Sequence, residues 1–139
     1  SLRNAGGPPL LVAVSSEVVS ARPAKLRRLE KQGVEFFALP RTTNKHSARQ
    51  LKPLLKHLAA HHAATNVLVE GGAHLFGTLF AQKLVDQALV FVAPRLMNDP
   101  SGRPPIVDSQ GHHFAGQFHL TLSLVQRIGA DVLLDYRKR

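Results

Sequence analysis

The chain has 139 residues, of which 44% are apolar, and a formal net charge of +9. This size suits one hydrophobic core, so we predict a single domain over residues 1–139. Cysteine is absent, which excludes disulfides and thiolate chemistry, and no apolar run approaches the ~20 residues that span a bilayer. No signal-peptide pattern opens the chain, so we expect a cytoplasmic protein with no membrane partner.

The positive charge is concentrated in one stretch. Between Arg22 and Lys56 there are ten Lys or Arg residues and two Glu residues, a net charge of +8. Such a stretch attracts nucleic acid, anionic lipid or phosphorylated small molecules, or it is a solvated basic surface. The few aromatic residues do not alternate with the basic ones, so a surface that stacks nucleic-acid bases is poorly supported.

The first part of the chain alternates strands and helices. Short apolar runs predict three strands, at Leu10–Val14, Val34–Leu39 and Val67–Glu70. Helical spacing predicts three helices, at about Pro23–Gln32, Leu51–His62 and Ala73–Gln82, with a loop at Arg41–Ala48. Pro53 is expected in a first helical turn, because an interior proline would cost about 3 kcal/mol. This alternation is typical of a parallel sheet with crossover helices.

The remainder has a different pattern. A long apolar strand is expected at Gln87–Pro94, followed by a loop rich in Pro, Gly, Asp and His at Arg95–Phe114. Alternating apolar residues predict a strand at Phe118–Arg127, and Val132–Tyr136 follows Gly129 as its hairpin partner. We predict an α/β fold whose central sheet is mostly parallel, with an antiparallel C-terminal hairpin and helices on both faces.

The most informative segment is Glu70-Gly71-Gly72, between a predicted buried strand and a predicted helix. A helix N-terminus presents unpaired N–H groups, and two glycines let a phosphate approach that backbone closely. The segment therefore predicts an anion site, with Glu70 beside it for chemistry or orientation. The alternative is that the two glycines form only a tight turn between the predicted strand and the predicted helix, with no ligand.

Ser15-Ser16 lies at the end of the first predicted strand, where an α/β sheet binds its ligands. The two hydroxyls suit ribose or phosphate, or they cap the helix that follows. The glycine pattern matches neither a P-loop nor the Gly-x-Gly-x-x-Gly fingerprint. No Ser-His-Asp order or suitably spaced carboxylate pair predicts a hydrolase.

Several histidines are candidate ligands. His57 and His61 share one helix face, but no nearby acidic residue completes a metal site, so we predict no metal. For His112-His113 we expect a solvent role. His74 follows the Gly-Gly turn, and it either approaches a bound phosphate or faces solvent.

The chain resembles the reductase domain of the bacterial bifunctional riboflavin biosynthesis deaminase/reductase. The resemblance lies in Pro9–Ser16, Gly33–Pro40, Val67–Gly72, Leu84–Pro94 and Ile128–Tyr136. It implies a dihydrofolate-reductase-like fold and NADPH-dependent reduction of the ribosyl group of 5-amino-6-(5-phosphoribosylamino)uracil to a ribityl group.

The resemblance also implies roles for individual residues. Gly71 and Gly72 would contact the NADPH pyrophosphate through backbone N–H groups, with His74 beside them. Ser15 and Ser16 match a hydroxyl pair near the adenosine 2′-phosphate, and Glu70 would lie close to the nicotinamide and the substrate ribose.

Two features depart from the family pattern. Ala73-His74 stands where relatives usually carry proline and a small hydroxyl residue, and nothing matches the family's first strands. We therefore expect the C-terminal portion of the domain, which exposes sheet edges and favours a homo-oligomer. The alternatives are another reductase of this fold, such as one acting on a pterin, or a non-catalytic nucleotide-binding remnant.

Overall fold

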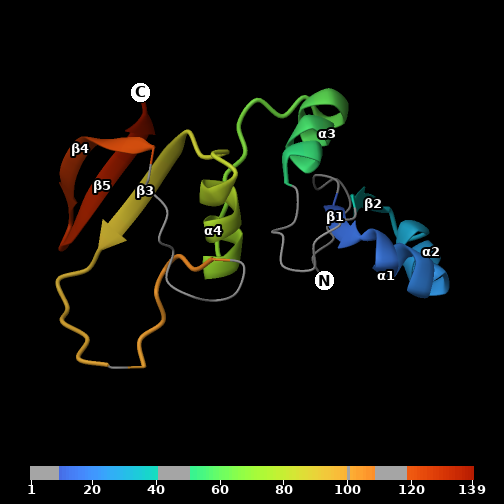
Figure 1. Ribbon diagram of the computed structural model, residues 1–139, viewed down its shortest axis with the longest axis horizontal. Coiled ribbons are helices and arrows are strands. Elements are labelled where there is room, and N and C mark those ends of the chain that lie inside the picture. Colours follow the sequence, from blue (N-terminus) through green and yellow to red (C-terminus); the bar gives the residue numbers. More distant parts are fainter. Residues whose placement is uncertain (1–9, 41–50, 100, 109–118) are drawn as a thin grey trace. The chain divides into compact units, whose positions relative to one another are not determined.

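The computed structural model describes residues 10–40, 51–99, 101–108 and 119–139 of the chain. The chain divides into two compact units, Ser1–Leu68 and Val69–Arg139, whose elements are labelled in Figure 1. We describe each unit by itself, and the single domain over residues 1–139 stays a prediction. The loop expected at Arg41–Ala48 and the pair His112-His113 lie outside the described residues.

The described residues of the first unit form a parallel strand pair and three helices. Its elements are β1 (Leu10–Ser15), α1 (Ser16–Ala21), α2 (Pro23–Glu30), β2 (Val34–Leu39) and α3 (Lys52–His62). β1 pairs with β2 in parallel, from Leu10 opposite Val34 to Ser15 opposite Leu39. The predicted elements are confirmed to within a residue or two at their ends, whereas α1 was not predicted.

Local sequence explains where α2 begins and ends. Pro23 occupies its first turn, where a fixed φ favours the helix and the missing N–H would have no partner. Gly33 reverses the chain at φ +78°, a conformation that a glycine adopts at little cost. Leu26, Val34 and Leu39 are then buried together as part of this unit's apolar core.

Where the structure describes it, the second unit consists of one helix and an antiparallel sheet. Its elements are α4 (Ala73–Ala81), β3 (Gln87–Val92), β4 (Leu120–Ile128) and β5 (Asp131–Lys138). The strand order is β3-β5-β4, so β5 is central (Figure 1). β4 and β5 form the predicted hairpin, with Ile128 opposite Asp131 and Gly129 in the turn at φ +63°.

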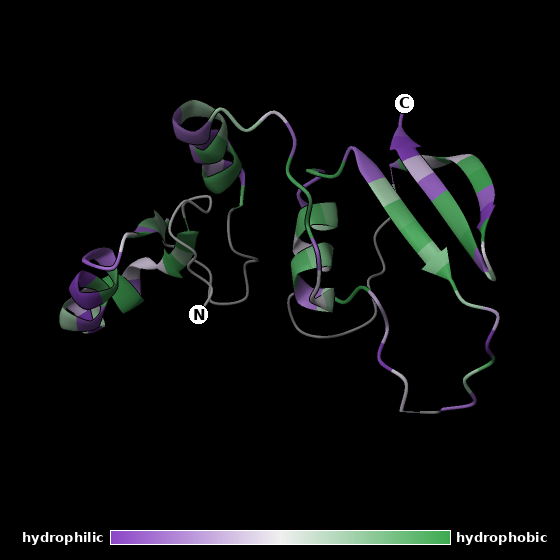
Figure 2. Ribbon diagram, turned by 180° about the vertical axis from the view of Figure 1, so that it is seen from behind, coloured by the Kyte–Doolittle hydropathy of each residue, from purple (hydrophilic) through white to green (hydrophobic). Residues whose placement is uncertain are grey.

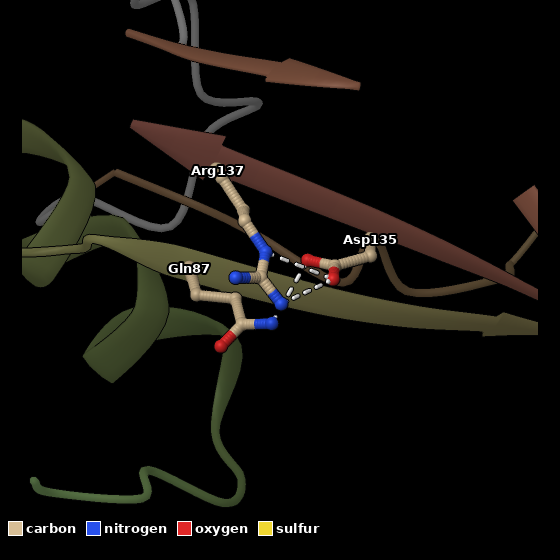
Figure 3. Close-up of polar contacts among 3 residues, drawn as sticks. All are labelled: Gln87, Asp135 and Arg137. Atoms are coloured by element: carbon tan, nitrogen blue, oxygen red, sulfur yellow. Dashed lines mark hydrogen bonds and ion pairs between the residues drawn. The ribbon is translucent and has the colours of Figure 1, made fainter. Parts of the chain in front are cut away.

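Asp135 is the one buried charged residue among those described, at 5% exposure, and it ties β3 to β5. Its carboxylate accepts hydrogen bonds from Gln87 Nε2 at 2.9 Å and from Arg137 Nε and Nη2 at 3.1 and 3.0 Å (Figure 3). The hydrogen bonds from Arg137, and then that from Gln87, hold the pKa of Asp135 below its usual value. This cluster joins residues 48 positions apart in the chain.

Two expectations about the sheet are not met among the described residues. Val67–Glu70, expected to be a buried strand, pairs with no other strand, and Leu68 is 80% exposed. The described strands form one parallel pair and one antiparallel sheet, so a mostly parallel sheet with helices on both faces is not confirmed. The physical reason is that a strand needs a hydrogen-bonding neighbour, and no described strand lies beside Val67–Glu70.

The antiparallel sheet carries apolar side chains that its own unit leaves exposed. Leu89, Val90, Phe91 and Val92 are consecutive in β3, and each is between 42% and 60% exposed. Because successive side chains of a strand point to opposite faces, β3 exposes apolar side chains on both faces of the sheet. Figure 2 colours most of this strand as hydrophobic.

Candidate site at the turn before α4

The Gly71-Gly72 turn leads directly into α4 and has the conformation that only glycine adopts easily. Gly71 has φ +94° and Gly72 has φ +84°. Gly72 is the N-cap residue, and as a glycine it has no side chain with which to cap the helix. The N–H groups of Leu75 and Phe76 both donate to Gly72 O, at 2.9 and 3.1 Å, so the helix is fully formed from its first turn.

The space around this turn is open. Among the described residues, a Cβ atom built on Gly71 would meet nothing within 4 Å, and one built on Gly72 would meet only Leu75 Cβ at 3.9 Å. A ligand can therefore approach the backbone closely. The N–H groups of a first helical turn and the positive end of the helix dipole make such a turn suitable for an anion.

Glu70 and His74 flank the two glycines, and both are exposed. His74 lies in the first turn of α4, where its Nδ1 is 3.2 Å from the carbonyl oxygen of Asp108. The structure thus brings four of the predicted site residues together in one unit: Glu70, Gly71, Gly72 and His74. One carboxylate, one imidazole and a set of backbone donors can bind a phosphate group and orient a neighbouring polar group.

Ser15 and Ser16 lie in the other unit, at the junction of β1 and α1. Ser15 is the N-cap residue of α1, but its side chain makes no capping hydrogen bond. Ser16 Oγ is shielded from solvent and has no hydrogen-bond partner among the described residues. A buried hydroxyl without a partner costs about 1–3 kcal/mol, so this position favours a partner that the described residues do not supply.

The histidines of α3 pack against a strand. The ring centroid of His57 lies 4.7 Å from that of Phe37 in β2 and 4.5 Å from that of His61. His62 Nε2 lies 3.3 Å from Glu35 Oε2. Within the described ranges, no three His, Asp or Glu side chains are arranged to hold a metal ion.

Sequence reasoning missed Gly77 and Val107. Gly77 is buried in the middle of α4, and a Cβ atom there would lie 1.7 Å from the carbonyl oxygen of Val107. Val107 N donates to Ala73 O at 3.2 Å, so its segment lies against the N-terminal half of α4. The available signal was an isolated glycine inside an apolar helical pattern, which often marks a close backbone approach.

Comparison with known proteins identifies the family. The profile of the RibD C-terminal domain matches residues 2–134. The chain belongs to the RibD C-terminal domain family. The riboflavin biosynthesis protein RibD of Chlamydia trachomatis serovar D is 34% identical to it over 85 residues, which is 61% of this chain and 21% of that protein.

Solved structures agree with this assignment. Form 2 of Acinetobacter baumannii RibD matches with a TM-score of 0.64 at 25% identity, and form 1 with a TM-score of 0.58 at 22% identity. Each match covers 81% of this chain and 29% of the RibD chain. The chain thus spans less than a third of the RibD proteins it matches. No helix among its described residues is long and apolar enough to cross a membrane.

Proposed function

We propose that this chain supplies the NADPH-binding part of the reductase that converts the ribosyl group of 5-amino-6-(5-phosphoribosylamino)uracil to a ribityl group. Membership of the RibD C-terminal domain family supports a place in riboflavin biosynthesis. The observation that carries the cofactor proposal is the Gly71-Gly72 turn, which leaves room for a ligand beside its backbone and leads directly into the N-terminus of α4.

The donor groups of the turn suit a dinucleotide. The backbone N–H groups of Gly71, Gly72 and the first turn of α4 would donate to the pyrophosphate oxygens. We assign the adenosine 2′-phosphate to Ser15 and Ser16, as the resemblance to the reductase family implies. NADPH itself would supply the hydride, and the chain's role is to position it.

Glu70 immediately precedes the turn and is exposed, so its carboxylate is accessible to a ligand held there. We assign it to the nicotinamide side of the site, where it would accept hydrogen bonds from the substrate ribose hydroxyls. This role orients the substrate.

A titration of the purified chain with NADPH and, separately, NADH tests the proposal. We expect tighter binding of NADPH, and loss of binding of both cofactors in Gly72→Val, because a branched side chain at φ +84° blocks the approach to the backbone. Gly129→Ala is the matched control, since it strains a similar positive φ in the hairpin turn and should leave cofactor affinity unchanged. Undiminished binding by Gly72→Val would place the cofactor elsewhere.

The same titration separates the remaining possibilities. Equal affinity for NADPH and NADH in the wild-type chain would remove the role of Ser15 and Ser16. Binding of NADPH without turnover of the phosphoribosylaminouracil would favour either a reductase of this fold with another substrate, such as a pterin, or a non-catalytic remnant.

We also propose that the chain forms a homo-oligomer through its antiparallel sheet. Phe91 and Val125 lie on the two edge strands and are 60% and 57% exposed, and a second copy would bury them. Sedimentation velocity at tens of micromolar should show a species larger than the monomer. A monomer alone at that concentration would contradict the proposal.

A further inference from the structure

Three histidines near the C-terminal end of α3 form what we call the histidine cluster: His57, His61 and His62. The ring centroid of His57 lies 4.5 Å from that of His61 and 5.6 Å from that of His62. Side chains four residues apart lie on the same face of a helix, one turn above the other, which is why His57 and His61 meet. The proposed function uses none of these side chains.

A residue of β2 restrains the first ring of the histidine cluster. The ring centroid of Phe37 lies 4.7 Å from that of His57, with the two ring planes tilted by 37°. This contact limits the rotamers of His57, so little conformational freedom remains to be lost when a ligand binds. His61 is exposed, so the pair formed by His57 and His61 is accessible from solvent.

The spacing of these two rings fits a single metal ion. Zinc binds an imidazole nitrogen at about 2.0–2.1 Å, so two such nitrogens at a tetrahedral angle lie about 3.4 Å apart. The two ring centroids then lie roughly 5 Å apart, close to the 4.5 Å that separates His57 from His61. A small rotation of either ring therefore suffices to bring both nitrogens onto one ion.

A carboxylate that the spacing along the chain does not reveal lies beside the histidine cluster. We predicted no metal from the sequence because no acidic residue lies near His57 and His61 in the chain. The fold supplies one from another element, since Glu35 Oε2 of β2 lies 3.3 Å from His62 Nε2. Its negative charge favours a divalent cation nearby, in a chain whose net charge is +9.

We propose that His57 and His61 bind one divalent transition-metal ion, of the class of zinc, nickel and copper, as a two-imidazole chelate on α3. Each ring gives one nitrogen lone pair to the ion. No three His, Asp or Glu side chains of the described residues are arranged to hold a metal, so water fills the remaining positions. The ion links two successive turns and stabilises the end of α3. The cofactor proposal can fail without affecting this one, because the two share no residue.

The first test is a calorimetric titration of the purified chain with Zn²⁺ at about pH 7.5, where free imidazole is mostly neutral. We expect His61→Gln to weaken zinc binding at least about tenfold, because it removes one of two linked ligands. His74→Gln is the matched control, since it removes an exposed helical histidine of the other unit and should leave the affinity unchanged. Equal affinity in the wild type and His61→Gln, or no binding of Zn²⁺ by the wild type at millimolar concentration, would overturn the proposal.

The second test locates the ion in the wild-type chain and does not depend on how any variant folds. In nitrogen-15 NMR spectra of the histidine rings, we expect one nitrogen of His57 and one of His61 to shift together on addition of Zn²⁺, with the same midpoint. Zinc binding that leaves both of these rings unchanged would place the ion at other histidines and overturn the proposal.

Discussion

Gly77→Ala should destabilise the second unit although alanine is the better helix former. Real Cβ atoms essentially never come within 3.0 Å of a heavy atom like Val107 O, whereas the alanine Cβ would start at 1.7 Å. The segment around Val107 must therefore move by more than 1 Å. Both contacting atoms belong to the backbone of Val107, so no change of side-chain rotamer relieves the overlap.

The loss of stability can be worked out from the contacts that Val107 makes with α4. Displacement removes the hydrogen bond from Val107 N to Ala73 O, worth about 1 kcal/mol, and uncovers the Val107 side chain, worth about 1.5–3 kcal/mol. The better helix propensity of alanine returns about 1 kcal/mol. We expect the free energy of unfolding of this unit to fall by about 2 kcal/mol.

Urea unfolding followed by tyrosine fluorescence measures this change selectively. The chain has no tryptophan and a single tyrosine, Tyr136, which lies in β5 and so reports on the second unit. A loss of about 2 kcal/mol lowers the midpoint by roughly 1 M urea. Gly102→Ala is the matched control, because its Cβ would lie 3.1 Å from Asp99 O and only a small adjustment is needed. An increase in stability of about 1 kcal/mol in Gly77→Ala would refute the reasoning, because helix propensity alone would then decide the outcome.

Three further outcomes follow from the antiparallel sheet. Asp135→Asn should destabilise the second unit, because it removes the charge that accepts hydrogen bonds from Arg137 and Gln87; urea unfolding with the Tyr136 signal measures the loss. The pKa of Asp135 is lowered in the folded state, so its carboxylate contributes to stability above the unfolded-state pKa, and this contribution is lost as the pH falls through the folded-state pKa. If the free energies of unfolding of Asp135→Asn and the wild type fell in parallel on acidification, this would contradict the prediction. Gly129→Ala should cost about 1 kcal/mol of stability, because an L residue is strained at φ +63°, and thermal unfolding that matches the wild type would argue against this turn geometry.

Local signals allowed most of the individual elements to be predicted from the sequence. Alternating apolar residues around Gly129 predicted the hairpin, and Pro53 lies in the first turn of α3 as expected. These features depend on residues close together in the chain, where backbone preferences and the spacing of apolar residues decide the structure.

The errors concern interactions between distant residues. Val67–Glu70 has the composition of a buried strand, but strand formation depends on a neighbour that composition does not reveal. The contact between Gly77 and Val107 was missed for the same reason. At the candidate site, the Gly-Gly turn and the start of α4 were predicted, whereas the hydrogen bond from His74 to the Asp108 carbonyl could not be read from spacing.

The strand order β3-β5-β4 has a consequence for synthesis of the chain. β5 lies between β3 and β4 in the sheet, yet it is the last of the three to leave the ribosome. Until β5 is complete, neither β3 nor β4 has its hydrogen-bonding partner, so the sheet cannot assemble strand by strand during translation. A nascent chain that stalls before Asp131 would therefore present two unpaired apolar strands at once, which is the kind of segment that chaperones bind.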